Sequence, residues 1–426
     1  MHDSRHAHPL LSLLLLCSLS RHADAYELID YFTGYGGRPL RAAYAIHAQN
    51  LSQVQHEVTV AAAANLKVRV LGSGWSWTDY FIDDAVYLRL TGGELTSFEL
   101  GQGVDGSSLI TAGGGTQFFS ISVFLRERGL QLEARGNCMN ANMSQTVGGL
   151  LATNVHHDGI RSFADITRWV DVVLANGTLV RSYRGEELFM LTIGGGGQTG
   201  IIVRACFDVV QRQVWRRSFL HLLWTPWTRR EPMQLINLLW VKTNVPYNAG
   251  TVGSIDWSTE EVERRQLMDI DGTISDTTSG RTLQAGMHYI EFEFFFPVSL
   301  RWSVARLLLG QGLSRPIRNW CSFGASAYVG LGVFRYVFRS QVYLAGNGYV
   351  GRTGPAAEED FYSVTLSRYQ QGSEDCLRRT FEALSDAFPG QIRVHPGKRH
   401  AIPLEHGVTP AVYELLDGYD PTGVFR

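Results

Sequence analysis

The sequence lacks an excess of basic residues. Its 38 lysines and arginines are balanced by 40 aspartates and glutamates, so the formal net charge is −2 at pH 7. Nucleic-acid binding usually needs a basic surface, and we expect no nucleic-acid partner. Internal repeats are also missing, which argues against a repeat architecture.

Cysteine is scarce, with five residues in the chain. Their spacing fits no metal site, so we expect no bound metal. Four of them follow the N-terminal segment: Cys138, Cys206, Cys321 and Cys376. Four cysteines allow three disulfide pairings in an oxidising compartment, and four separate buried thiols are the alternative.

Long apolar runs are absent after the N-terminus, where none reaches the roughly 18 residues of a membrane span. Residues 1–25 have the pattern of a signal peptide, with an apolar run at Pro9–Leu19 and a cleavage site at Ala23–Ala25. We expect secretion or an endomembrane lumen, with an uncleaved signal anchor as the alternative. N-glycosylation sequons at Asn50, Asn142 and Asn176 agree with this route.

Glycine, in contrast, is abundant, with 45 residues among 426. That length allows one to three domains. The hydrophobic pattern from residue 26 to about 212 is α+β, and the composition changes near Arg212. Expected helices are 51–65, 118–129, 298–312 and 375–388. Expected strands are 67–71, 85–90, 107–113, 169–174, 179–183, 287–297, 328–344 and 361–369, with a hairpin turn at Asn176-Gly177.

The most informative segment is Leu71–Asp79, which follows a β-rich run. It contains Gly72, Ser73, Gly74, Trp75 and Ser76. A backbone with so few Cβ atoms can approach a pyrophosphate closely and direct several N–H groups at it.

Two later segments are also rich in small residues. Gln145–Gly159 contains Thr146, Val147, Gly148, Gly149, Thr153 and His156. Gly194–Val203 contains Gly197, Gly200, Ile201 and Ile202. The glycines are typical either of close backbone approach to a bulky ligand or of a flexible exposed loop. A lone histidine such as His156 either touches that ligand or is a structural residue with satisfied hydrogen bonds.

Together these segments resemble the flavin-binding half of the vanillyl-alcohol oxidase family, and within it the aldonolactone and alditol oxidases. The resemblance implies a two-subdomain PCMH-type FAD-binding domain at 26–212. A cap, or substrate, domain with a central antiparallel sheet would follow at 213–426, its last segment returning to the flavin. The small residues of the three segments are then the expected FAD contacts, with Gly148 or Gly149 leaving room for dioxygen.

The sequence departs from the family at several positions. Trp75 stands where many relatives have a histidine that bonds covalently to the flavin, so we expect non-covalent FAD. Gly332–Ala345 resembles the substrate-binding strand, and Arg335 matches its arginine, but Val333 replaces its glutamate. A histidine of the following strand is also missing.

The C-terminal motif His395–His400 resembles H-W-G-K, with Pro396 in place of the tryptophan. His395 and Lys398 keep the spacing, and Asp420–Phe425 resembles a family ending. The resemblance implies that Lys398 stabilises negative charge on reduced flavin, whereas a solvated basic loop is the alternative. Glu293 matches an acidic family position and is expected to be structural.

The expected activity is that of an FAD-dependent oxidase acting on an aldonolactone, polyol or sugar alcohol, with O2 as acceptor and H2O2 as product. An L-gulono- or galactono-1,4-lactone oxidase is the most specific form of this expectation. Arg335, Lys398 and His395 are the expected catalytic residues. A non-catalytic flavoprotein that binds glycans, or a dehydrogenase with another acceptor, are the alternatives. Membrane contact is expected only if the signal segment stays uncleaved.

Overall fold

The structure is a computed structural model. It describes residues 26–27, 32–33, 39–40, 42–73, 76, 84–134, 145–156, 161–212, 216–218, 256–258, 290–308, 329–330, 334–368, 374–398 and 410–426. Several residues singled out in the sequence lie outside this set: the signal segment, Gly74, Trp75, Cys138, Asn142, Cys321 and Val333.

The first subdomain is built on a sheet with strand order β1-β4-β6-β5. Its strands are β1 (Tyr26–Glu27), β4 (Ala42–Ala48), β5 (Val68–Val70) and β6 (Ala85–Leu90), and both β4 and β5 run parallel to β6. Helix α2 (Leu51–Ala63) connects β4 to β5, as parallel strands require. Its N-cap is Asn50, whose side chain accepts a hydrogen bond from the Gln53 N–H at 3.0 Å.

The second subdomain contains an antiparallel sheet with strand order β11-β10-β12-β8-β7. The strands are β7 (Phe98–Gln102), β8 (Ser108–Gly113), β10 (Thr167–Val173), β11 (Leu179–Tyr183) and β12 (Ile201–Asp208). The turn between β10 and β11 has Gly177 at φ +78°, which suits glycine. Helices α3 (Phe118–Arg126) and α5 (Val147–Ala152) bury Ile121, Leu125, Leu150 and Leu151 in the core of this subdomain.

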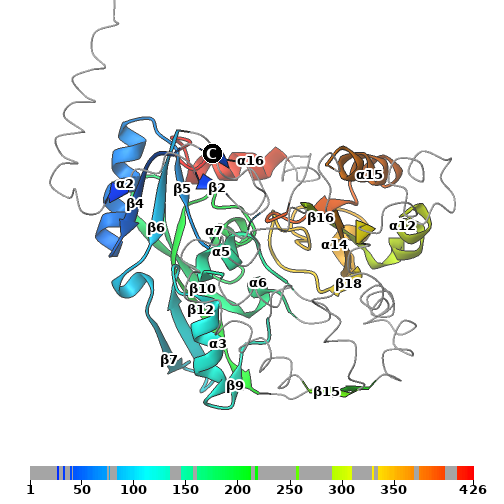
Figure 1. Cartoon of the computed structure of the whole chain (residues 1–426), viewed down its shortest axis with the longest axis horizontal. Helices are drawn as coiled ribbons and strands as arrows, with labels where there is room; N and C mark the ends of the chain where they lie inside the picture. The colour runs from blue at the N-terminus through cyan, green and yellow to red at the C-terminus, as the bar shows by residue number, and fades with distance from the viewer. Residues whose placement is uncertain are drawn as a thin grey trace, which may run out of the picture.

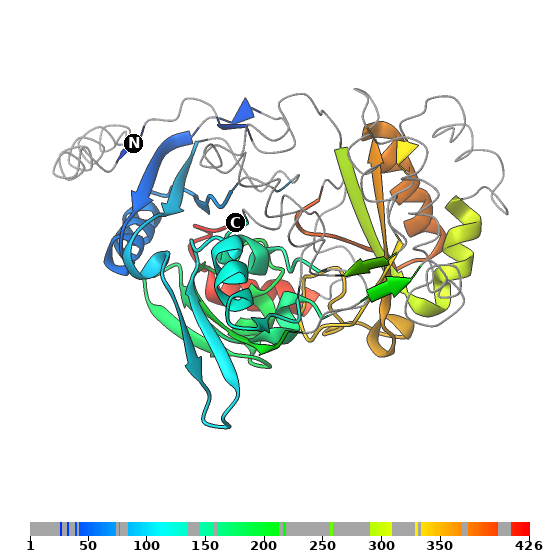
Figure 2. The ribbon, with the colours of Figure 1, turned by 60° about the horizontal axis from the view of Figure 1, so that its bottom comes forward.

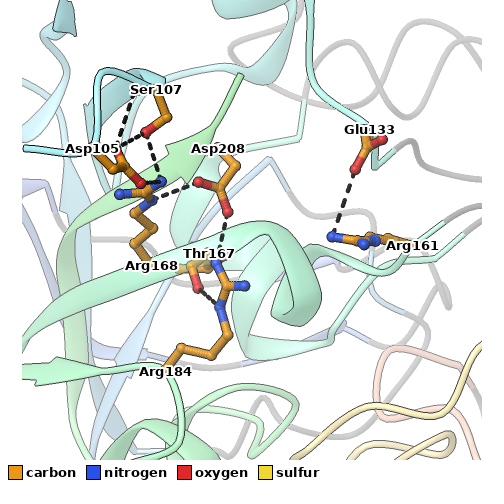
Figure 3. Close-up of polar contacts among 8 residues, drawn as sticks. All are labelled: Asp105, Ser107, Glu133, Arg161, Thr167, Arg168, Arg184 and Asp208. Carbon is orange, nitrogen blue, oxygen red and sulfur yellow. Dashed lines mark hydrogen bonds and ion pairs between the residues drawn. The ribbon is translucent and has the colours of Figure 1, made fainter. Parts of the chain in front are cut away.

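An arginine–aspartate network joins the strands at one end of this sheet (Figure 3). Arg168 on β10 donates to Asp208 on β12 at 2.5 Å and to Asp105 in the β7–β8 turn at 3.0 Å. Arg184 also donates to Asp208, at 2.8 Å. Hydrogen bonds from Ser107 and Arg168 hold the pKa of Asp105 below its usual range, so the network is charged at neutral pH.

The cap domain has a third sheet in which β17, β18 and β16 all pair with β19, and β20 pairs with β16. The strands are β16 (Ile290–Pro297), β17 (Val329–Gly330), β18 (Phe334–Val337), β19 (Phe361–Arg368) and β20 (Arg393–Val394). Phe292, Phe294 and Phe296 alternate along β16 and pack with helices α12 (Arg301–Leu308) and α15 (Glu374–Ala387). These helices cover the sheet face that points away from the first two subdomains (Figures 1 and 2).

One expected strand is wrong in its extent. The sequence predicts strand over 328–344, but β18 ends at Val337 and the chain leaves the sheet. The segment 338–349, hereafter the bridging loop, crosses to the first two subdomains, which form the half expected to bind FAD and are hereafter called the FAD-binding half. There the Tyr343 N–H donates to the Met190 carbonyl at 3.0 Å and Asn154 donates to Asn347 at 3.0 Å. These contacts outweigh the β propensity of the segment.

The chain ends on the first subdomain. Helix α16 (Pro410–Tyr419) buries Val412 and Leu416 against Leu191 and Leu344. After it, the Val68 N–H donates to the Val424 carbonyl at 2.8 Å, and Phe425 joins the core of the first sheet. Figure 1 shows α16, in red, lying with the FAD-binding half.

The remaining short elements connect these layers. They are β2 (Phe32–Thr33), β3 (Pro39–Leu40), η2 (Gly93–Leu95), β9 (Leu130–Gln131), α6 (Phe163–Ile166), α7 (Glu187–Thr192), β13 (Val210–Gln211), β14 (Arg216–Ser218), β15 (Asp256–Ser258), η5 (Val298–Leu300) and α14 (Pro355–Glu358). Within the described residues no helix is long and apolar enough to cross a membrane, and no cluster of His, Cys, Asp or Glu could hold a metal ion.

Cys206 on β12 is a buried free thiol. Burial raises its pKa, so it stays protonated at neutral pH. Because each of the three full pairings of the four cysteines uses Cys206, all three are excluded.

Candidate functional site

The first two glycine segments meet directly. β5 leads into Gly72, and a Cβ added at Gly72 would lie 2.7 Å from Oγ1 of Thr146. Thr146 is the N-cap of α5, and its hydroxyl accepts a hydrogen bond from the Gly149 N–H at 3.3 Å. Glycine at position 72 therefore allows the first loop to lie against the start of α5.

The third glycine segment closes the other end of α5. The N–H groups of Gly194 and Gly196 donate to the carbonyls of Leu151 and Ala152, both at 2.8 Å. These bonds satisfy carbonyls that a helix end leaves without partners. Both glycines have positive φ, at +74° and +64°, which explains why the segment is so rich in glycine. Gly197 also has positive φ, at +82°.

Close packing continues behind this turn. A Cβ at Gly200 would lie 2.5 Å from the Val173 carbonyl oxygen, and Ile201 and Ile202 begin β12 as buried residues. On α5, the Gly148 N–H donates to the Gly114 carbonyl at 2.7 Å. The small residues at these positions thus let backbone segments pack closely against one another.

The C-terminal motif lies on the same structure. Residues His395–Lys398 form a tight turn in which the Lys398 N–H donates to the His395 carbonyl at 3.1 Å. A Cβ at Gly397 would lie 3.1 Å from Cγ2 of Thr153, just after α5, and the Ser76 hydroxyl donates to the Gly397 carbonyl at 3.3 Å. Segments about 320 residues apart in sequence therefore share one junction.

A buried polar cluster lies beside this junction. His156 Nε2 is 2.9 Å from Glu293 Oε1, and the Ser363 hydroxyl donates to the same oxygen at 2.8 Å. The imidazole of His156 packs against the rings of Phe295 and His395, at centroid distances of 5.0 and 5.2 Å. The Gly397 N–H donates to His395 Nδ1 at 2.9 Å, and the His395 N–H donates to the Glu293 carbonyl at 3.0 Å.

The cluster has cationic neighbours. Arg393, two residues before His395, is almost fully buried, and this burial lowers its pKa to about 10. Its guanidinium donates to the carbonyl of Tyr343 in the bridging loop at 2.8 Å. Lys398 is half-buried. The junction is thus a buried, polar region with positive charge nearby.

The structure places several of the sequence-derived site residues in this region. Those it brings to the junction are Gly72, Ser76, Thr146, Gly149, Thr153, His156, His395 and Lys398. Ser73 immediately follows Gly72, and Val147 is buried in the core on α5. The backbone of Arg335, on β18, pairs with Ser363 on β19.

Sequence reasoning treated Glu293 as structural and did not single out Ser363 or Phe295. The alternation along β16 does place Glu293 and Phe295 on one face of the strand, opposite the buried phenylalanines of the α12–α15 side. No spacing rule could have identified His156 as the partner of Glu293, because the two residues lie 137 positions apart.

Two observations test whether the junction fits a flavin dinucleotide. His156 Nδ1 is buried and has no hydrogen-bond partner among the residues that the structure describes. Gly72 and Thr146 pack against each other, so two segments with few Cβ atoms lie together at the start of α5. A buried polar atom without a partner and a small-residue backbone are both consistent with a large polar ligand.

Comparison with known proteins supports this interpretation. Residues 42–183 match the model of an FAD binding domain. The chain is 25% identical over 226 residues to a D-arabinono-1,4-lactone oxidase of Candida glabrata, a match that covers 46% of this chain and 41% of that protein.

A solved structure of a solvent-stable cholesterol oxidase has a similar fold over nearly the whole chain. The TM-score is 0.63 at 15% sequence identity, covering 94% of this chain and 96% of the other. The expected α+β fold, an FAD-binding half followed by a cap with an antiparallel sheet, is confirmed. The chain therefore contains an FAD binding domain and takes FAD as its cofactor.

Proposed function

We propose that the protein is an oxidase that removes a hydride from a hydroxyl-bearing carbon of an aldonolactone, polyol or sugar alcohol. The observation that carries this proposal is the junction itself. Its Ser76, Thr153 and His156 come from the FAD-binding half, whereas His395 and Lys398 come from the C-terminal motif. The 25% identity to a D-arabinono-1,4-lactone oxidase supports the substrate class.

FAD, when bound, supplies the two-electron acceptor. In this proposal the backbone around Gly72–Ser76, Thr146–Gly149 and Gly197–Ile202 holds the cofactor without a covalent bond. Arg335 orients the substrate oxygen. Lys398 and His395 stabilise negative charge that develops on the cofactor as hydride arrives.

The proposed acceptor for reoxidation is O2, with H2O2 as product. The test is a panel of aldonolactones and polyols, added without oxygen to the yellow protein. Bleaching of the flavin absorbance identifies a substrate, and peroxide released on admission of air identifies an oxidase. A protein that no compound bleaches is a non-catalytic flavoprotein. One that bleaches but yields no peroxide is a dehydrogenase with another acceptor.

A further inference from the structure

The two ring nitrogens of His156 have different environments. The side chain is fully buried, with Nε2 2.9 Å from Glu293 Oε1. Nδ1 has no hydrogen-bond partner among the described residues. Because a carboxylate can only accept hydrogen bonds, the proton of the neutral imidazole lies on Nε2. Nδ1 then presents a lone pair and is a hydrogen-bond acceptor.

Glu293 is itself fixed in place. The Ser363 hydroxyl donates to its Oε1 at 2.8 Å, and its main-chain carbonyl accepts from the His395 N–H at 3.0 Å. The carboxylate therefore cannot turn away from His156 without also losing its hydrogen bond from Ser363, and the main chain that carries it is held by His395. Ser363 is also the backbone partner of Arg335, which links this cluster to the strand expected to bind substrate.

A purely structural role for His156 does not explain why its Nδ1 has no hydrogen-bond partner among the described residues. A buried polar atom without a partner is destabilising, and native structures rarely leave one. Glu293 and His395 are titratable residues that contact the imidazole ring. Nδ1 of His395 accepts from the Gly397 N–H, and no described group, His395 included, donates a hydrogen bond to His156 Nδ1.

We propose that His156 accepts the proton of the substrate hydroxyl and that Glu293 is its positioning residue. The proposal rests on the oxidase function proposed above. The proton of the substrate hydroxyl moves to Nδ1 of His156. The hydrogen bonded to the hydroxyl-bearing carbon leaves with its electron pair to FAD. The C–O single bond becomes a carbonyl, so the substrate is oxidised by two electrons and the cofactor is reduced by two.

Glu293 contributes by holding the tautomer and by stabilising the positive imidazole ring that the proton transfer creates. A carboxylate that holds a histidine in this way keeps the acceptor nitrogen directed at the reacting group. His156 is then a catalytic residue, and Glu293 acts only through it.

The variants His156→Asn and Glu293→Gln in the FAD-loaded full chain test this assignment. The introduced asparagine cannot accept the proton, and the introduced glutamine has no carboxylate to stabilise the positive imidazole ring. Both still offer hydrogen-bonding groups of similar size. The matched control is Glu57→Gln, at a buried glutamate on α2. Anaerobic stopped-flow reduction by the best substrate is measured from about pH 5 to pH 9, the range in which histidine titrates.

We expect His156→Asn to slow flavin reduction by about 100-fold or more, within the range of lost general-base catalysis. Glu293→Gln should slow it by about tenfold and move the acid limb of the pH profile to lower pH, because the positive ring loses its partner. Glu57→Gln should stay within about twofold. His156→Asn that reduces at the wild-type rate with FAD bound overturns the proposal.

Nitrogen-15 NMR of the histidine rings gives a readout independent of turnover, with and without FAD. We expect the Nε2-protonated tautomer for His156 in the wild type and its loss or mixing in Glu293→Gln. A wild-type His156 protonated on Nδ1 would overturn the proposal even if His156→Asn failed to fold. If no compound reduces the wild-type flavin, the proposed oxidase function fails and the proton-acceptor role fails with it.

Discussion

Gly346 in the bridging loop is the position where a single methyl group should disturb the site most directly. A Cβ at Gly346 would lie 2.1 Å from Cδ2 and 2.3 Å from Cε2 of Phe295. The Phe295 ring is almost fully buried and packs on His156 at 5.0 Å and near His395 at 6.2 Å. Gly346→Ala must therefore move a buried ring.

Overpacking of this kind typically costs about 1–3 kcal/mol, and the severity of the overlap places Gly346→Ala at about 2–3 kcal/mol. Since the displaced ring presses on the two histidines, flavin reduction should also slow by about tenfold to 100-fold. Urea unfolding of the FAD-loaded protein, followed by tryptophan fluorescence and circular dichroism, measures the first effect. Stopped-flow reduction measures the second.

A double-mutant cycle decides whether the ring is the cause. Phe295→Ala alone should cost about 3–5 kcal/mol, because it removes a buried ring. In that background Gly346→Ala should cost less than about 0.5 kcal/mol, since the obstructing atoms are gone. Gly101→Ala, where a Cβ would meet nothing within 4 Å, is the control and should stay within about 0.5 kcal/mol. Equal costs of Gly346→Ala in both backgrounds would refute the reasoning.

Other predictions concern the cofactor, the site and the domain contact. Because Trp75 cannot form the covalent link, acid precipitation should release FAD into the supernatant, and a fluorescent band on a denaturing gel would contradict this. Arg335→Ala should lower kcat/KM while FAD stays bound, because the change removes about 2–4 kcal/mol of transition-state stabilisation. An unchanged kcat/KM would show that Arg335 does not touch the substrate. Lys398→Met should slow flavin reduction far more than it weakens FAD retention, and a wild-type reduction rate would place Lys398 in a solvated loop. Burial raises the pKa of Asp165, which accepts hydrogen bonds from Ser162 and Ser340, so stability is lost as pH rises through that raised pKa. Asp165→Asn keeps an acceptor oxygen and should match wild-type stability at pH 7 or exceed it by up to about 1 kcal/mol. Its urea midpoint should depend less on pH than that of the wild type.

The spacing of apolar residues was sufficient to predict a helix or strand where one face of that element is buried. Val54, Val58 and Ala61 recur at helical spacing and lie buried on α2, and the alternation along β16 matches its two faces. Strand β7 was not predicted, because its residues are exposed or half-buried and show no apolar alternation. Helix α16 was also missed, although it buries Val412 and Leu416.

The features that the sequence did not predict depend on tertiary contacts. The residues after Val337 have strand propensity, yet the bridging loop leaves the sheet because its backbone and side chains find partners on the FAD-binding half. The small-residue segments were identified from composition, but their packing partners were not. Contacts such as Gly72 with Thr146, or Gly397 with Thr153, depend on a fold that brings distant segments together.

The two halves of the molecule are joined at the site by directional polar contacts. Asn154 donates to Asn347 at 3.0 Å, the Ser162 and Ser340 hydroxyls lie 2.7 Å apart, and His156 contacts Glu293. Apolar burial is non-directional and tolerates small shifts, whereas buried polar groups are costly unless their partners are correctly placed. Each of these pairs is satisfied only when the cap is docked in one position on the FAD-binding half. The same contacts that fix the cap therefore fix the positions of Glu293, His395 and the strand of Arg335 relative to the segments expected to bind the flavin.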